Sequence, residues 1–241
     1  MVPGERLCSA TACESMMERM GIVGAMAGEL APLLRSARAE RVSGASVNLF
    51  ESDRFVVGYA GMGRAAAIAA CEAVVARGAL SVLISAGWVG SLHAGIPVKS
   101  VQRPALVIDA ESGESFEVPE GAGTLVTVGR VANAVEKQEL VTRWSADTVD
   151  MEASHVARFA RERRIPFACV KTVSDAHDEA LPDFARFSDE GQFQTGEFVR
   201  WLMVRPRWWP VMMRMGRNSA AAARAMCVEL SRDSAQRHGE G

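Results

Sequence analysis

Three carboxylates end short apolar segments, which is where an α/β protein collects catalytic groups. Glu29 ends the segment GAMAGE, Glu152 ends VDME and Asp175 ends VSD. In open α/β sheets, ligands bind beyond the carboxyl ends of the strands, so the three side chains are expected at one site. Together they could act as a base, a sugar-binding group and an acid. That combination can cleave a glycosidic bond.

Each of these side chains also has a purely structural interpretation. Glu29 and Glu152 could be first-turn glutamates that favour a helix N-terminus. Asp175 could cap the helix that follows it, and Met151 could be a core residue. The functional interpretation is preferred because the three segments occur together in one chain.

The composition indicates one α/β domain with a sizeable core. The chain has 241 residues, of which 49% are hydrophobic. Its formal net charge of -2 gives no reason to expect nucleic acid or an anionic membrane as a partner.

Five scattered cysteines without a CxxC pair argue against structural zinc or a disulfide framework, and we expect a reducing, cytoplasmic compartment. No metal or cofactor is expected, since the histidines lack metal-binding spacing.

The chain divides into a leader, one domain and a short end. Residues 1–19 are expected to be a mobile leader, because they are too charged for a signal peptide. Residues 20–232 form a single domain whose helical tail starts at about residue 198, and residues 233–241 are expected to fray.

Residues 78–98 lack charged groups over a membrane-spanning length. Their glycines and proline instead favour a buried strand that leads into a Gly-rich loop, so no membrane span is expected.

Apolar runs alternate with helical patterns along the chain. Strands are predicted at residues 21–26, 47–50, 55–59, 80–85, 105–109, 124–128, 148–151 and 166–173, and helices at 29–39, 64–77, 137–144, 152–163 and 219–231. Most of these strands are apolar throughout. This pattern predicts a largely parallel sheet covered on both faces.

Five segments, in order and spacing, resemble the nucleoside phosphorylase/nucleosidase superfamily, and most closely its methylthioadenosine/S-adenosylhomocysteine nucleosidases. The segments are IVGAM with Glu29, GMG at 61–63, the loop at 85–92, DME at 150–152 and SDAHD at 174–178. The resemblance implies a three-layer α/β/α phosphorylase/hydrolase-like domain with a mixed, largely parallel central sheet. It also implies a homodimer that acts on a small-molecule nucleoside, with no nucleic acid as partner.

The resemblance also assigns roles to residues. Asp175 would protonate the leaving purine, and Glu29 would act as the base or position the attacking water. Glu152 would accept hydrogen bonds from the ribose hydroxyls. Substrate contacts are expected from Met151, Glu152, Ser174, Trp88, Gly87 and the backbone near Val131. Because a carboxylic acid must carry a proton to act as an acid, Asp175 would need a closed site or a proton relay.

The segment at residues 85–92 bears on the choice of nucleophile. Phosphorylase relatives have Ser or Thr where this chain has Trp88, and Arg where it has Ser85. A phosphate dianion needs such groups, so water is the favoured nucleophile. The predicted function is hydrolysis of a 5′-substituted adenosine to release adenine. Two alternatives stay open: a phosphorylase that uses Arg64, and a non-catalytic nucleoside-binding protein.

The C-terminal quarter is rich in Trp, Met and Arg. Residues 205–210 (RPRWWP) and 217–219 (RNS) resemble the tail of hopanoid-associated nucleosidases, whose proposed substrate is adenosylhopane. Residues 201–215 could face lipid or line the substrate site. The preferred interpretation is a helix that packs on the domain or on a second subunit. If the tail lines the site, a large apolar 5′ substituent is expected.

Overall fold

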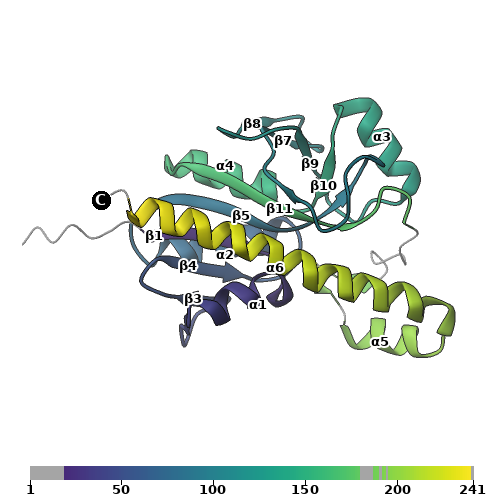
Figure 1. Ribbon diagram of the computed structural model, residues 1–241, viewed down its shortest axis with the longest axis horizontal. Helices are drawn as coiled ribbons and strands as arrows, with labels where there is room; N and C mark the ends of the chain where they lie inside the picture. The colour runs from purple at the N-terminus through teal and green to yellow at the C-terminus, as the bar shows by residue number, and fades with distance from the viewer. Residues whose placement is uncertain (1–18, 180–186, 190–191, 194, 240–241) are drawn as a thin grey trace, which may run out of the picture.

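One large mixed sheet runs through the protein, with helices on both faces (Figure 1). The computed structural model describes residues 19–179, 187–189, 192–193 and 195–239. The predicted three-layer α/β/α domain is confirmed. Arg19, the last residue of the predicted leader, begins the first strand, and residues 1–18 lie outside the described residues.

The elements alternate along the chain as the sequence predicted. The strands are β1 (Arg19–Gly24), β2 (Glu40–Arg41), β3 (Asn48–Glu51), β4 (Phe55–Tyr59), β5 (Leu80–Ser91), β6 (Val101–Gln102), β7 (Leu106–Asp109), β8 (Ser115–Glu117), β9 (Thr124–Thr127), β10 (Thr148–Asp150), β11 (Phe167–Asp175), β12 (Ser188–Asp189) and β13 (Gln192–Phe193). The helices are α1 (Ala27–Ser36), α2 (Arg64–Val75), α3 (Ala134–Trp144), α4 (Ala153–Arg163), α5 (Thr195–Met203), the 3-10 helix η2 (Pro206–Trp208) and α6 (Trp209–Gly239).

The centre of the large sheet consists of two parallel blocks joined by β5, and the antiparallel strands β2, β3, β6 and β8 lie outside these blocks. Strands β4, β1, β5 and β11 run parallel to one another, as do β7, β9 and β10. Strand β5 pairs with β1 as far as Ser85 and with antiparallel β10 from Gly90 onward. Its 12 residues therefore pass from one block to the other. The ends of β1, β10 and β11 meet beside the second half of β5.

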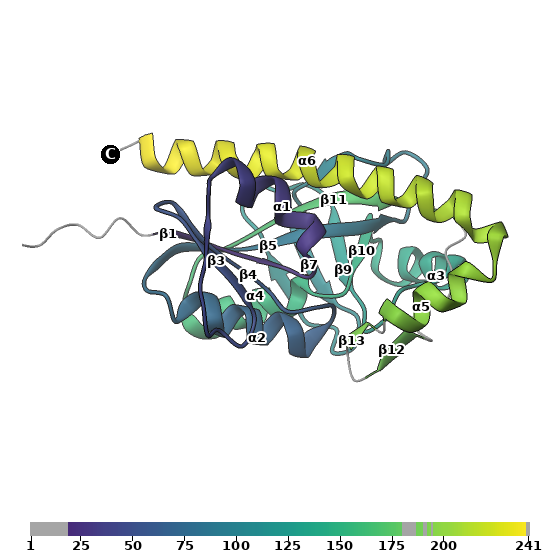
Figure 2. The same cartoon turned by 90° about the horizontal axis from the view of Figure 1, so that it is seen from below.

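Two helical layers cover the sheet (Figure 2). Helices α1 and α6 pack on one face, where Leu33 and Leu230 lie with Ile84 in a core cluster. Helices α2 and α4 pack on the other face, where Val74 and Val156 belong to a second cluster. These five side chains are at most 1% exposed. Each such buried side chain contributes about 1.5–3 kcal/mol by leaving water, so these contacts hold the helices against the sheet that carries the site.

The predicted Gly-rich loop after residue 85 is wrong, because β5 continues to Ser91. The glycines make room for side chains rather than for a turn. A Cβ atom on Gly87 would lie 2.9 Å from Oε1 of Glu29, and one on Gly90 would lie 3.0 Å from Oδ2 of Asp175. A larger residue at Gly87 would force the Glu29 carboxylate to shift, and one at Gly90 would require Asp175 to give way by a few tenths of an ångström. Composition alone does not distinguish this use of glycine from a loop.

The C-terminal quarter forms a helical hairpin that projects beyond the sheet (Figures 1 and 2). The predicted helix at residues 219–231 is the middle of α6, which begins at Trp209 and extends to Gly239. The half of α6 beyond the hairpin packs against α1, β5 and β11.

Candidate active site

A cavity of about 230 Å³ lies where β1, β10 and β11 end beside β5. The residues that line it come from elements far apart in the sequence. They are Ala25, Met26, Glu29, Met62, Trp88, Val89, Gly90, Val128, Arg130, Val131, Ala132, Lys137, Val149, Asp150, Met151, Glu152, Ser174, Asp175, Phe198 and Met215. The three carboxylates singled out in the sequence therefore share one cavity.

Glu29 is fixed by three backbone N–H groups. Its Oε2 accepts hydrogen bonds from Ala25 (2.8 Å) and Met26 (2.9 Å), and its Oε1 accepts one from Trp88 (3.1 Å). The side chain thus also closes the N-terminus of α1, as its structural interpretation expected. Burial raises the pKa of Glu29, although these hydrogen bonds and the charge of Lys171 offset part of the effect. A carboxylate with a raised pKa is a better base near neutral pH.

Asp175 belongs to a buried hydrogen-bonded group of three side chains. The hydroxyl of Ser174 donates to Oδ1 at 2.8 Å, and the ammonium of Lys137 donates to Oδ2 at 2.7 Å. Lys137 also donates to the carbonyl of Ala176 at 3.0 Å. The side chains of Lys137 and Asp175 are only 6% and 8% exposed. Asp175 is therefore directly connected to a group that carries a proton.

Glu152 is held by the turn that precedes α2. Its Oε1 accepts a hydrogen bond from the backbone N–H of Gly63 at 2.8 Å. Gly63 has a φ of 86°, a left-handed conformation that favours glycine. Burial and the nearby charge of Asp150 raise the pKa of Glu152 to about 8. Glu152 is also the N-cap residue of α4, the position that its structural interpretation expected, although its side chain makes no capping hydrogen bond to that helix.

A buried ion pair lies beside these carboxylates. Lys171 Nζ is 2.8 Å from Oδ2 of Asp150, and the two side chains are 2% and 0% exposed. Thr127 Oγ1 donates to the other oxygen of Asp150 at 2.7 Å. Burial alone would lower the pKa of Lys171, but the charges of Asp150, Cys169 and Glu152 and the hydrogen bond to Asp150 together outweigh burial, so the pKa is raised. Lys171 therefore places a permanent positive charge beside Glu152 and Glu29.

Most of the predicted site residues line the cavity, and two do not. Trp88, Val131 and Met151 line it together with the catalytic candidates. Gly87 is not part of the lining and instead lies against the Glu29 carboxylate. Arg64, the candidate for binding phosphate, is exposed and also outside the lining.

Sequence reasoning missed the two buried lysines and the contribution of the tail. Lys171 interrupts the apolar strand FACVKTV, and a charge in a buried strand needs a partner. That signal was available. Lys137 has no comparable signal, since it lies in a polar helix. Phe198 and Met215 line the cavity from α5 and α6. The sequence raised residues 201–215 as a substrate-lining alternative, a range that includes Met215 but not Phe198.

Comparison with known proteins supports the resemblance to the phosphorylase superfamily that the sequence suggested. The model of the phosphorylase superfamily matches residues 110–200. No curated protein matches the chain in sequence. Among solved structures, Helicobacter pylori 5′-methylthioadenosine/S-adenosylhomocysteine nucleosidase has a TM-score of 0.69 at 15% identity, covering 93% of this chain and 99% of its own.

Two further solved structures have similar scores. Helicobacter pylori futalosine hydrolase has a TM-score of 0.68 at 16% identity, covering 90% of this chain and 97% of its own. Arabidopsis thaliana 5′-methylthioadenosine nucleosidase has a TM-score of 0.68 at 16% identity, covering 90% and 94%. The chain thus has the nucleoside phosphorylase/nucleosidase fold. The predicted resemblance to the phosphorylase superfamily is confirmed.

Proposed function

We propose that this protein hydrolyses the N-glycosidic bond of a 5′-substituted adenosine and releases adenine. The observation that carries the proposal is the shared cavity of Glu29, Glu152 and the group formed by Asp175, Ser174 and Lys137. These provide a base, a ribose-binding carboxylate and a proton donor. The solved structures with this fold include nucleosidases, which supports the same reaction class.

The leaving purine receives its proton at N7 from the Asp175–Lys137 pair. As the bond between C1′ and N9 breaks, its electron pair moves into the purine ring. A proton on Lys137 passes through Oδ2 of Asp175 to N7, and the lysine becomes neutral. The 2.7 Å contact between the two side chains supports this route. Lys137 is a suitable source, because its ammonium donates a hydrogen bond directly to Oδ2 of Asp175.

Water attacks C1′ from the side of Glu29, which accepts the water proton. The three backbone hydrogen bonds fix this carboxylate in place. Phosphate is disfavoured as nucleophile because the cations at the cavity are already paired with carboxylates. Lys137 pairs with Asp175, Lys171 with Asp150, and Arg130 with Glu136. A phosphate dianion would need free cations or backbone N–H groups.

Glu152 and Met151 hold the ribose. A carboxylate can accept hydrogen bonds from the 2′- and 3′-hydroxyls together, and the Met151 side chain offers an apolar surface to the sugar. The 5′ group then meets the wall formed by Phe198 and Met215. Both side chains are apolar, so the proposed 5′ substituent is apolar too. It ranges from a methylthio group to a large hydrocarbon such as that of adenosylhopane.

The proposal is tested by adenine release from 5′-methylthioadenosine in phosphate-free buffer. We expect turnover without phosphate and its loss in Asp175→Asn. Turnover that depends strictly on phosphate would establish a phosphorylase instead. Binding of adenosines without turnover, in either buffer and with 5′-alkyl substituents of increasing length, would establish a binding protein.

A further inference from the structure

The tail hairpin, residues 195–217, carries an exposed apolar surface at the end of the molecule that projects beyond the sheet. It comprises α5, η2 and the first turns of α6 (Figures 1 and 2). Five large apolar side chains on it are well exposed: Val199 (46%), Met203 (68%), Val204 (70%), Trp209 (48%) and Met213 (65%). Exposed apolar side chains gathered in this way mark an interaction surface.

The hairpin has an aromatic cluster of its own, apart from this exposed apolar surface. On its inner side, Phe187, Phe198 and Trp201 pack with ring centroids 5.3–6.2 Å apart, and Trp201 lies 6.1 Å from Trp208. These rings form a separate aromatic cluster. Trp209 also donates a hydrogen bond from Nε1 to the carbonyl of Leu202 within the hairpin at 3.0 Å. The exposed parts of the five side chains are left to contact something else.

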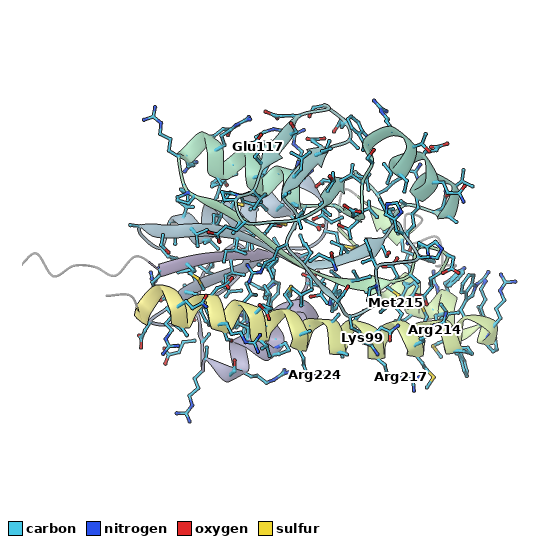
Figure 3. The ribbon with its side chains drawn as sticks, turned by 45° about the horizontal axis from the view of Figure 1, so that its top comes forward. Lys99, Glu117, Arg214, Met215, Arg217 and Arg224 are labelled. Carbon is cyan, nitrogen blue, oxygen red and sulfur yellow. The ribbon has the colours of Figure 1, made fainter. Side chains whose placement is uncertain are left out.

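The charge on the hairpin is mostly positive, since it contains five arginines and one acidic residue, Glu197. Residues 198–228 contain six arginines and no Asp or Glu, although the whole chain has a net charge of -2. Arg200, Arg207 and Arg217 are exposed, whereas Arg214 pairs with Glu179 at 2.8 Å. Figure 3 shows Arg217 and Arg224 on the edge of α6 turned away from the sheet. The overall charge, which gave no reason to expect an anionic membrane, hides this local concentration.

We propose that the tail hairpin docks on the surface of an anionic lipid bilayer. Methionine, valine and tryptophan side chains would enter the headgroup boundary, while the arginines extend to the lipid phosphates. In the described part of the chain no helix is long and apolar enough to cross a membrane. Docking would therefore be interfacial. The surface stands independently of the proposed nucleosidase activity.

Charge argues for lipid over the two other possible occupants. In a symmetric dimer the same patch faces itself, which would set the five arginines of one hairpin against those of the other, with Glu197 as the one acidic residue of each hairpin. Nucleic acid would match the charge but not the exposed Met203, Val204 and Met213. An anionic bilayer matches both features. Phe198 and Met215 of the same hairpin line the cavity, so docking would bring the cavity wall to the lipid surface.

Vesicle flotation tests the proposal with the full chain. Vesicles of equal parts phosphatidylcholine and phosphatidylglycerol are compared with pure phosphatidylcholine. We expect binding to the anionic vesicles and much weaker binding to the neutral ones. Raising the salt from about 0.1 M to about 1 M shortens the screening length from about 10 Å to about 3 Å and should weaken binding.

Two sets of variants separate the apolar and charged contributions. Arg200→Gln with Arg217→Gln should weaken binding about thirtyfold, since each arginine near an anionic surface contributes about fivefold. Met203→Gln with Met213→Gln should weaken it by about tenfold for each residue. The matched controls change exposed residues elsewhere, Arg35→Gln with Arg54→Gln and Val135→Gln with Val228→Gln, and should bind as the unaltered chain does.

The results of these experiments distinguish an anionic bilayer from a second copy of the chain and from nucleic acid. Equal binding to neutral and anionic vesicles, or none to either, would overturn the proposal. So would a stable dimer that dissociates in the Met203→Gln with Met213→Gln variant, or binding to a duplex oligonucleotide in place of vesicles. Turnover of 5′-methylthioadenosine should be unchanged in all four pairs. A chain that binds vesicles but lacks turnover would contradict only the proposed function.

Discussion

Replacing Lys137 by methionine tests whether the lysine is the proton source. The ammonium lies 2.7 Å from Oδ2 of Asp175 in a site where both side chains are less than 10% exposed. A positioned proton donor contributes roughly 10²–10⁴-fold to rate. We therefore expect kcat for adenine release to fall by at least about 10²-fold in Lys137→Met. A similar fall is expected in Asp175→Asn, because the two groups act in one relay.

The substitution also has a predictable effect on stability. Removing one partner of a buried ion pair costs about 3–5 kcal/mol, since the other charge stays buried. For a chain of this size, 3 kcal/mol corresponds to a Tm lower by roughly 6–12 °C. The double variant Lys137→Met with Asp175→Asn leaves neither charge, so it should recover most of this loss. Its kcat should nevertheless be no lower than that of Asp175→Asn alone.

A second substrate separates proton donation from general damage to the site. A p-nitrophenyl riboside releases a phenolate that needs no proton. Lys137→Met should therefore cleave it nearly as fast as the unaltered enzyme, while adenine release is slow. Equal losses on both substrates would refute the assigned role. Faster adenine release in Lys137→Met would show that the lysine holds Asp175 in an inactive form.

Three further predictions follow from the site. Gly87→Ala would place Cβ 2.9 Å from Oε1 of Glu29, and a displaced carboxylate should lower kcat roughly tenfold to hundredfold in the adenine assay. The pKa of Glu152 is raised to about 8, so kcat/KM should rise with pH towards 8 as this group ionises and accepts both ribose hydroxyls. Glu152→Gln should remove that rise and lower kcat/KM about tenfold to hundredfold. Lys171→Met should destabilise the fold by about 3–5 kcal/mol in denaturant titration, because it leaves Asp150 buried and unpaired.

Each of these three predictions would be contradicted by a specific result. An unchanged kcat in Gly87→Ala would show that the position of Glu29 is not critical. A pH profile that keeps its rise in Glu152→Gln would assign that rise to another group. If Lys171→Met with Asp150→Asn were no more stable than Lys171→Met alone, the cost would come from packing rather than from the unpaired charge.

The sequence determined the architecture through patterns that are local to each segment. Apolar runs, such as residues 21–26 that begin in β1, predict strands buried on both faces, and their alternation with helices predicts a layered sheet. Glu29, Glu152 and Asp175 lie at the junctions between such runs and the segments that follow, so their common location could be expected from the topology of open sheets. The glycines of β5 were misread as a loop, because their function depends on side chains that approach from other elements.

The tertiary structure alone decided which groups meet at the site. Lys137 and Asp175 are 38 residues apart, and nothing in the helix that carries Lys137 indicates its partner. The contributions of Phe198 and Met215 depend on how the tail hairpin folds back towards the sheet. Local sequence sets which face of an element is apolar, because that depends on neighbours along the chain. Contacts between distant elements depend on how all the faces pack at once, so they become visible only in the folded protein.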